Sequence, residues 1–254
     1  MTRPRDAEPA VRPIQLDVAL TADVVVAARL RGSTALVVDV LRASTTIITA
    51  LANGASAIVP VGTPDEARAR AATIDNALVA GERGGERIPG FDLGNSPVEV
   101  EAGRVRGRTI VLTTSNGTRA LLASRQAAAI GIAGLANLSA AVEWAEHQHR
   151  DVTVVCAGSM GAVSLEDQVC AGLLLDRLAA RVMSPRLSET ATATVALARG
   201  YDKDVARLAT DSRWAQKLAR AGYAADVAAC LTVDTTALVP VYLPSIDKVV
   251  LWPG

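Results

Sequence analysis

The sequence is poor in the side chains that carry most hydrolytic and metal chemistry. Its only histidines are His147 and His149, both in the polar stretch EHQHR. The sequence therefore offers almost no candidate for a histidine general base or for a metal site built from several histidines. The three cysteines, Cys156, Cys170 and Cys230, are an odd number, lie far apart and form no CxxC pair. This argues against a disulfide framework or a zinc knuckle and favours a reducing cytoplasm.

Further absences narrow the class of protein. No apolar run approaches the roughly 18 residues of a membrane span, and the start, MTRPRDAEPAVRP, lacks the apolar core of a secretory signal. We interpret residues 1–12 as a flexible tail. Lys plus Arg and Asp plus Glu are equal at 26 each, so net charge suggests neither a nucleic-acid partner nor a membrane surface. The chain also lacks a P-loop and a GxGxxG motif, which disfavours a nucleotide-binding enzyme.

What is present is an alternation of short β-branched runs and Ala-rich stretches. The runs typical of strands are IQLDV, ALVVDV, SAIVPV, ALVAG, TIVLTT, AAIGI and VTVVCAG. The stretches between them predict helices at about 44–53, 63–74, 96–103, 117–125, 137–149 and 164–182. Continuous apolar strands separated by helices indicate an α/β fold with a mostly parallel sheet that is covered on both faces.

The pattern changes after about residue 184 to one helix after another, as far as about residue 236. The last apolar pair, ALVPVYLP and DKVVLW, is typical of strands that return to the sheet. No repeat and no low-complexity linker divides the chain. We therefore expect one domain over residues 13–254 with a helical section near its C-terminus. The sequence leaves a homo-oligomer open.

Four polar, mostly Gly-rich loops follow predicted strands: DVLRASTT, GERGGERIPGFDLGNSP, TTSNGT and CAGSMGAVSLED. In open α/β sheets such loops gather at the carboxyl ends of the strands, where ligands bind. We expect the four loops to form a single cleft.

The first loop concentrates an acid, a base and three hydroxyls. Asp39 ends an apolar strand, and Arg42 offers a planar fork that suits an anion. The hydroxyls add donors at a helix start, which is itself an anion site: Ser44, Thr45 and Thr46. In the alternative reading, Ser44 only caps the helix and Arg42 is a solvated surface residue. For the whole cluster, anion binding is the favoured interpretation.

The second and third loops add candidate substrate ligands. The second holds Glu82, Asn95 and Ser96. Long ordered loops are usually functional, and a mobile surface flap is the alternative. The third loop surrounds a tight turn with groups that can bind an oxyanion or serve the turn alone: Thr114, Asn116, Gly117 and Thr118.

The fourth loop holds Ser159, a further candidate for substrate binding, and the adjacent acids Glu166 and Asp167. Acids in the first turn of a capped helix are normal, because they favour the helix dipole. Together with Asp39 and Glu82, these acids could instead ligate Mg²⁺, which binds through one or two carboxylates, waters and substrate oxygens.

An inventory of carboxylates, hydroxyls, Arg and backbone amides suits metal-assisted phosphoryl transfer to water. The candidate catalytic residues are Asp39, Arg42, Glu166 and Asp167. The candidate metal ligands are Asp39, Glu82, Glu166 and Asp167. The expected partner is a small anionic, phosphorylated substrate.

Four segments in this order and spacing resemble the 2-phosphosulfolactate phosphatases, the ComB family: VVDVLRASTTI, GERGGERIPGFDLGNSP, TTSNGTRAL and CAGSMGAVSLEDQVCAG. The resemblance is closest over about residues 35–180. It implies a three-layer α/β/α fold and a Mg²⁺-dependent phosphatase that hydrolyses (2R)-O-phospho-3-sulfolactate to (2R)-3-sulfolactate and phosphate. In methanogens this step belongs to coenzyme M biosynthesis, and a relative elsewhere would act on a related phosphorylated 2-hydroxy acid. A substrate with phosphate, sulfonate and carboxylate would explain several oxyanion-binding loops.

Two alternatives to this reading remain. In one, Asp39 is a nucleophile that forms an aspartyl-phosphate, as in haloacid-dehalogenase-like enzymes, although their second acid two positions later is here Leu41. In the other, the chain is a non-catalytic binding protein for small organic anions. Such a protein would keep the Arg and hydroxyl loops but would need no cluster of acids, so the acids favour the enzyme.

Overall fold

The structure, a computed structural model, describes residues 12–252, so the predicted tail at residues 1–12 lies outside it except for its last residue. Its strands are β1 (Ile14–Ala19), β2 (Thr34–Val38), β3 (Ala57–Pro60), β4 (Leu78–Arg83), β5 (Glu86–Arg87), β6 (Thr109–Thr113), β7 (Ala129–Ala133), β8 (Val152–Cys156), β9 (Pro185–Leu187), β10 (Pro240–Leu243) and β11 (Lys248–Leu251). They form one 11-stranded sheet in the order β5-β4-β6-β3-β11-β10-β7-β2-β8-β1-β9.

The α-helices connect these strands and then form the C-terminal section. They are α1 (Ala27–Leu30), α2 (Ala43–Ala52), α3 (Pro64–Ala71), α4 (Ala102–Val105), α5 (Gly117–Ala123), α6 (Leu138–His147), α7 (Leu165–Ala179), α8 (Glu189–Ala198), α9 (Leu208–Asp211), α10 (Arg213–Leu218) and α11 (Ala224–Cys230). Within residues 12–252, no helix is long and apolar enough to cross a membrane.

Apart from the edge strand β5, which pairs antiparallel to β4, the sheet consists of two parallel blocks with a hairpin between them. Strands β4, β6 and β3 are parallel, as are β7, β2, β8, β1 and β9. The hairpin β10–β11 pairs antiparallel to β7 on one side and to β3 on the other. The prediction of a mostly parallel sheet is therefore confirmed, and the C-terminal strands do return to it. Strand β3 ends at Pro60, which cannot donate to the ladder.

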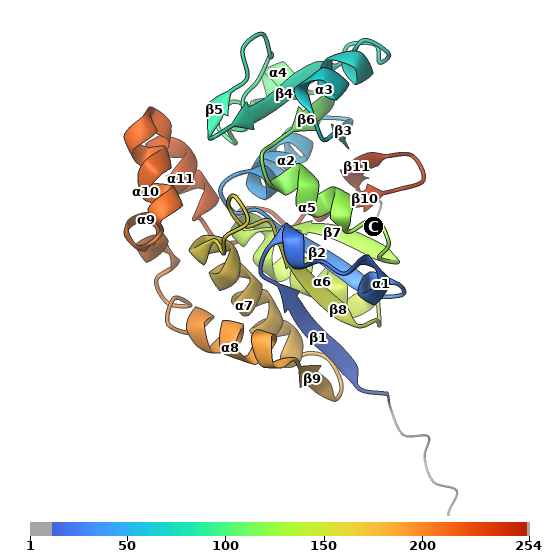
Figure 1. Cartoon of the computed structure of the whole chain (residues 1–254), viewed down its shortest axis with the longest axis vertical. Helices are drawn as coiled ribbons and strands as arrows, with labels where there is room; N and C mark the ends of the chain where they lie inside the picture. Colours follow the sequence, from blue (N-terminus) through green and yellow to red (C-terminus); the bar gives the residue numbers. More distant parts are fainter. Residues whose placement is uncertain (1–11, 253–254) are drawn as a thin grey trace, which may run out of the picture.

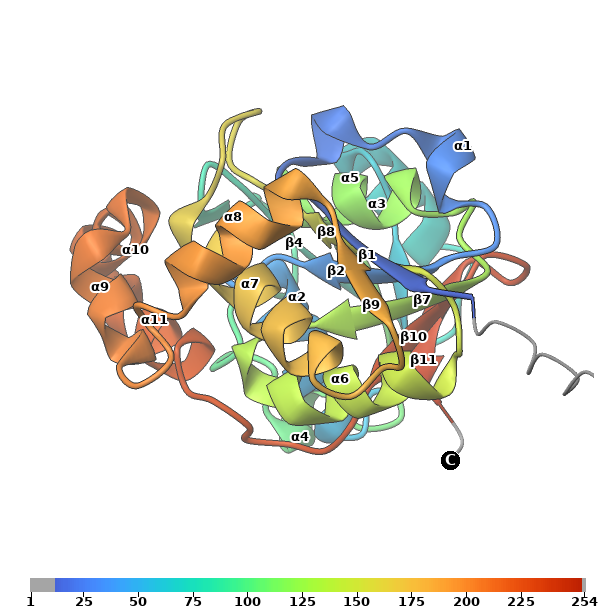
Figure 2. The same ribbon diagram turned by 90° about the horizontal axis from the view of Figure 1, so that it is seen from below.

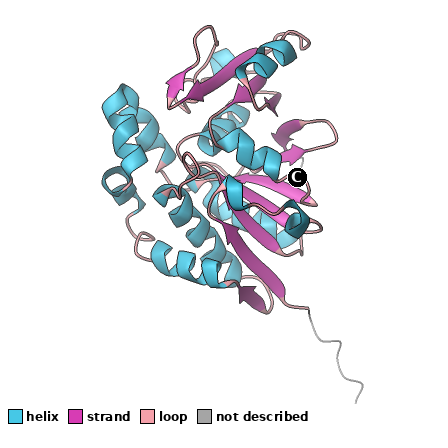
Figure 3. Ribbon diagram, viewed as in Figure 1, coloured by secondary structure: helices cyan, strands magenta, loops and turns pink. Residues whose placement is uncertain are grey.

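Helices cover both faces of the sheet, so the three-layer α/β/α architecture is confirmed. In β2, Leu36 and Val38 pack in one hydrophobic cluster with α6 and α7, whereas Ala35 and Val37 pack in a second cluster with α5. Figure 2 shows α6 and α7 on one side of the strands and α1, α3 and α5 on the other. Figure 3 shows the strands as the middle layer between the helices.

The predicted helical section near the C-terminus is present as α8 to α11. Figure 1 shows α9, α10 and α11 grouped on one side of the molecule, beyond the end of α7. Their buried apolar residues join the cluster that contains α6 and α7: Leu208, Ala215, Leu218, Val227 and Cys230. The section is therefore attached to the sheet through the main core.

The structure corrects the predicted helix at 96–103, because α4 is a single turn over Ala102–Val105. The side chain of Ser96 donates to Asp226 instead of capping a helix. The side chain of Glu99 accepts from the amide of Gly94, which holds the preceding residues in a turn. The short strands β5 and β9 and the one-turn α1 were not predicted, because two to four residues carry no readable period.

Candidate active site

All four polar loops line one cavity at the carboxyl ends of the strands. The lining residues, of which several were predicted, are Asp39, Leu41, Arg42, Glu82, Gly85, Asn95, Asn116, Gly158, Ser159, Ser164 and Trp214. We call this the acid cavity. Asp39 follows β2, Glu82 lies near the end of β4, and Ser159 follows β8. The side chain of Trp214 reaches the cavity from α10, in the C-terminal section.

Asp39 is held at the turn from β2 to α2. Its Oδ1 accepts from the backbone N–H of Ala43 at 3.3 Å, and its own N–H donates to Oγ of Ser44 at 2.9 Å. Ser44 in turn donates to the carbonyl of Val37 at 3.2 Å. Ser44 was a candidate cap and oxyanion ligand; it lies inside the first turn of α2, and its hydroxyl closes the loop instead.

Gly117 allows the Asp39 carboxylate to approach the start of α5. A Cβ atom at Gly117 would overlap Oδ2 of Asp39 and would lie 2.5 Å from Cβ of Ala43. Real Cβ atoms do not tolerate such contacts, so a glycine is required here. Gly117 thus shapes the site through its missing side chain.

Burial changes the acidity of Asp39. The pKa of Asp39 is raised from 3.8 to about 7, and the main cause is removal of the carboxyl group from water. The negative charges of Glu82 and Glu166 raise this pKa further, whereas the hydrogen bond from the Ala43 amide and the positive charge of Arg42 lower it. A carboxyl group in this environment is stabilised by a proton or by a bound cation.

Arg42 is buried rather than solvated, which excludes the surface reading of this residue. Its Nη1 donates to Oδ2 of Asp226 at 2.6 Å, and its Nη2 donates to the carbonyl of Gly85. Its guanidinium also stacks over the ring of Tyr223, 4.3 Å from the centroid. The predicted anion binder is therefore fixed by three contacts to two other segments of the chain, the loop at Gly85 and residues 223–226.

Asp226 is a site residue that the sequence did not predict. It lies in α11, is buried, and accepts from Oγ of Ser96 at 2.8 Å as well as from Arg42. Ser96, a predicted substrate ligand, thus contacts Asp226 in this structure. A signal was available, since Asp226 is the single charged residue in the small apolar stretch AADVAACL.

Glu82 organises the loops on the far side of the cavity. Its Oε1 accepts from the backbone N–H of Ser115 at 2.7 Å, and its Oε2 accepts from the N–H of Gly85 at 2.7 Å and from Oγ of Ser115 at 3.2 Å. Both oxygens are therefore engaged. Glu82 ties the second loop to the third and brings Gly85 to Arg42.

The adjacent acids at the start of α7 have different surroundings. Asp167 accepts from the N–H of Val40 at 2.8 Å and of Gly158 at 3.1 Å, so it joins the first and fourth loops. Glu166 accepts from Oγ of Ser212 at 2.7 Å. Burial is the main cause that raises the pKa of both acids, and for Asp167 the charges of Asp39 and Glu166 add to it.

Most of the predicted hydroxyl donors are used within their own loops. Thr45 donates to the carbonyl of Val40 at 3.2 Å, and Thr114 accepts from the N–H of Thr118 at 3.0 Å. Thr118 donates to the carbonyl of Thr114 at 3.2 Å. The hydroxyl of Thr46 is buried and, within the described residues, without a hydrogen-bond partner.

Two predicted amides also lie in the acid cavity. Oδ1 of Asn116 accepts from the backbone N–H of Met160 at 3.3 Å, which joins the third loop to the fourth. Oδ1 of Asn95 is buried and has no partner among the described residues. An unpartnered buried oxygen at the wall of an acidic cavity is suited to a cation or to a donor group of a ligand.

The metal chemistry of the site is that of oxygen ligands. Among residues 12–252, no group of three or more His, Cys, Asp or Glu side chains is close enough together to enclose a metal ion. Mg²⁺ does not need such a cage, because it commonly uses one or two carboxylates and completes its shell with water and substrate. Asp39 and the oxygen of Asn95 fit this mode of binding.

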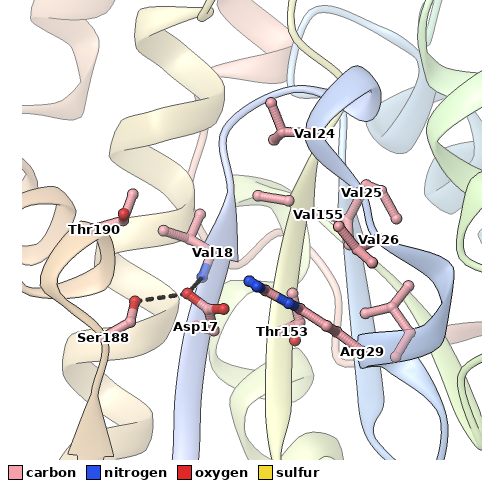
Figure 4. A pocket seen from close by; sticks show the side chains of 12 residues that line it. Asp17, Val18, Val24, Val25, Val26, Arg29, Thr153, Val155, Ser188 and Thr190 are labelled. Carbon is pink, nitrogen blue, oxygen red and sulfur yellow. Dashed lines mark hydrogen bonds between the residues drawn. The ribbon is translucent and has the colours of Figure 1, made fainter.

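A second cavity of about 270 Å³ lies away from the acids, along β1 and β8. Figure 4 shows Ser188 donating to Asp17 at one wall, while Arg29 extends across the opening toward Asp17. The other lining groups are mostly valines and threonines. Without a cluster of acids or a strongly shifted group, this cavity offers less chemistry than the acid cavity.

The fold and the acid cavity together define a class: an α/β protein with buried carboxylates and a buried arginine at the carboxyl ends of its parallel strands. The sequence model of the 2-phosphosulpholactate phosphatase family matches residues 19–244. The chain therefore belongs to the 2-phosphosulpholactate phosphatase family, as its motifs predicted, and it is a phosphoric monoester hydrolase.

Curated relatives support the assignment over most of their length. A probable 2-phosphosulfolactate phosphatase of Symbiobacterium thermophilum is 40% identical over 218 residues, which cover 85% of this chain and 94% of the relative. The corresponding proteins of Pseudothermotoga lettingae and Deinococcus radiodurans are 40% and 39% identical, covering 82% and 84% of this chain and 88% and 89% of the relatives. An enzyme is thus favoured over a non-catalytic binding protein.

Proposed function

We propose that this phosphatase depends on Mg²⁺ and hydrolyses (2R)-O-phospho-3-sulfolactate to (2R)-3-sulfolactate and phosphate, or acts on a related phosphorylated 2-hydroxy acid. The names of the relatives suggest the substrate. The observation that carries the proposal is the buried set of acids around Asp39, beside an arginine that is fixed in place.

Asp39 is the strongest candidate for holding the metal. Its Oδ2 accepts no hydrogen bond from the described residues, whereas both oxygens of Asp167 accept backbone N–H groups. Glu82 and Glu166 lie close enough to Asp39 to raise its pKa. When bound, Mg²⁺ would neutralise the negative charge that develops on the transferred phosphoryl group.

Arg42 is suited to bind and orient the substrate. A guanidinium carries five N–H donors, and Arg42 uses one toward Asp226 and one toward the carbonyl of Gly85. The remaining donors are available to an oxyanion in the acid cavity, which Arg42 lines. Because the contacts to Asp226 and Gly85 fix the plane of the group, little conformational entropy is lost on binding.

Water is the proposed nucleophile. The competing scheme, in which the Asp39 carboxylate attacks phosphorus, leaves a phosphate on the enzyme between the two half-reactions. Rapid acid quenching of turnover with ³²P-labelled substrate distinguishes the schemes. Water attack leaves no label on the protein, and attack by Asp39 leaves it on the peptide that contains this residue.

Phosphate release from synthetic phosphosulfolactate tests the proposal as a whole. We expect turnover with Mg²⁺ and none in excess chelator, with metal analysis to confirm removal. Thermal unfolding with and without Mg²⁺ gives a second readout that does not depend on turnover. Full activity of the metal-free protein would refute the metal dependence, and release from other phosphate esters alone would redirect the search to another acid.

A further inference from the structure

The acid cavity is too small to hold the whole of such a substrate. It encloses about 20 Å³, which is close to the space that one water molecule needs. A phosphate ester of a sulfonated hydroxy acid has three anionic groups on a three-carbon chain. One oxygen of the phosphate can enter this space and approach the acids, so the rest of the substrate must occupy an adjoining space.

A larger cavity of about 580 Å³ adjoins the acid cavity and shares the side walls Ser159, Ser164 and Trp214 with it. Trp214 is anchored where the two meet, since its indole N–H donates to the carbonyl of Leu41 at 3.0 Å. We call this space the outer cavity. A ligand whose phosphate reaches the acid cavity can extend past Trp214 into it.

The outer cavity is lined by two cations on the same face of α10. Arg213 and Lys217 are four residues apart, the spacing that places side chains together on a helix. The ammonium of Lys217 lies 4.7 Å from the ring centre of Trp214, which holds it at the wall. In the part of the chain that the structure describes, neither cation forms an ion pair with an acid.

The acids that line the outer cavity are already engaged. Asp211 accepts from the hydroxyl of Tyr201 at 2.9 Å and from Arg207 at 3.1 Å. Glu166 accepts from Ser212 at 2.7 Å. Both acids therefore have partners of their own, and the two cations are available to bind an anionic group of a ligand.

Other arginines near the site are committed elsewhere. Arg83 donates to the carbonyls of Glu82 and Gly62 and to the hydroxyl of Thr113. Arg119 forms an ion pair of 2.6 Å with Asp23. Within residues 12–252, Arg213 and Lys217 are the cationic side chains lining the acid cavity or the outer cavity that have no acid partner.

We propose that the outer cavity is the specificity site for the second strong acid of the substrate, and that Arg213 and Lys217 bind its sulfonate while the phosphate lies at Asp39 and Arg42. This inference rests on the proposed function. In this inference, the two cations on α10 distinguish a phosphoester that carries a sulfonate from one that carries only a carboxylate besides its phosphate.

Paired substrates test the assignment. Phosphosulfolactate and 2-phospholactate share the phosphate and the carboxylate but differ in the sulfonate. In Lys217→Gln and in Arg213→Gln we expect the ratio of kcat/KM for phosphosulfolactate to that for 2-phospholactate to fall about fivefold each, and at least tenfold in the double variant. The change should appear in KM, because the contact is made equally in the ground and transition states.

Lys203→Gln is the matched control, since Lys203 is exposed in the same C-terminal section but lines neither cavity. We expect it to leave the substrate ratio unchanged. An equal loss on both substrates in Lys217→Gln, or an unchanged ratio in the double variant, would overturn the inference.

Binding of the product measured by calorimetry separates this inference from the proposed function. We expect sulfolactate to bind the wild-type protein and to bind the double variant at least about tenfold more weakly. If no phosphoester is hydrolysed but this loss of binding is seen, the proposed reaction fails and the outer-cavity assignment stands. If phosphosulfolactate is hydrolysed and sulfolactate binding is unaffected by the double variant, the assignment fails and the reaction stands.

Discussion

Replacing the Asp39 carboxylate by an amide should abolish most activity and stabilise the metal-free protein at the same time. Asn keeps the size of Asp, and its carbonyl oxygen can still accept from the amide of Ala43. What Asp39→Asn removes is a buried negative charge among Glu82, Glu166 and Asp167. Activity and stability therefore move in opposite directions, which a simple loss of folding cannot imitate.

The size of the stabilisation follows from the raised pKa. Between pH 3.8 and about 7 the folded protein keeps the Asp39 proton, whereas the unfolded chain has released it. The free energy of unfolding therefore falls as pH rises through this window, and the full loss is present above pH 7. A pKa that rises from 3.8 to about 7 corresponds to roughly 4 kcal/mol. In chelator at pH 8, Asp39→Asn should be more stable than wild type by up to that amount.

The assays are denaturant unfolding in chelator at pH 5 and pH 8, and turnover at saturating Mg²⁺. We expect turnover of Asp39→Asn to be at least about a hundredfold below wild type, because metal charge neutralisation typically supplies several kcal/mol. Added Mg²⁺ should stabilise wild type and leave the variant unchanged. A folded variant with near-normal turnover, or one that is less stable than wild type at pH 8 in chelator, would refute the reasoning.

Three further substitutions test individual contacts. Arg42→Lys keeps the charge but loses the planar fork, so kcat/KM should fall at least about tenfold, ~1.4 kcal/mol; an unchanged efficiency would remove Arg42 from the site. Gly117→Ala places a Cβ atom against Asp39, so we expect destabilisation of about 1–3 kcal/mol in chemical unfolding, with reduced turnover; a neutral effect would contradict the close approach. Asp167→Asn leaves one backbone N–H facing an amide donor, so at about pH 3, where the carboxyl is protonated in the folded and the unfolded state alike, stability should fall by about 1–3 kcal/mol; unchanged stability there would mean that these two hydrogen bonds do not hold the loops.

The sequence predicted the layers of the fold and the location of the site for the same physical reason. Apolar strands buried on both faces leave few places for polar groups, so polar residues that directly follow a strand indicate its carboxyl end. Asp39, Glu82 and Asn116 were found in this way, and all three line the acid cavity. Local sequence was sufficient because each residue lies at, or within three positions of, the carboxyl end of its own strand.

Local sequence was not sufficient where the partner is distant. Asp226 contacts Arg42 across 184 positions, and an acid on a helix usually indicates a solvated face. Trp214 lies in α10, far from the end of any strand, so the strand-end pattern could not identify it. The central position of the β10–β11 hairpin was equally hidden, because no residue in a strand identifies its neighbour in the sheet. The roles of Ser44 and Thr45 also depended on loop geometry rather than on residue type.

The charge balance of the acid cavity explains why the C-terminal section, which carries Asp226, is part of the site. It also shows that the acids around Asp39 need a further positive charge. Asp226 pairs with Arg42, so Arg42 offsets the acids around Asp39 only in part. Buried carboxylates without a counter-charge are unfavourable, and a proton or a cation relieves them. A substrate with several negative charges adds to the same excess, so it should bind better when Mg²⁺ is present. By linkage the substrate then increases the affinity for Mg²⁺ by the same factor. Titrating each ligand at several fixed concentrations of the other measures both factors, and two independent affinities would mean that the metal and the substrate do not share this cavity.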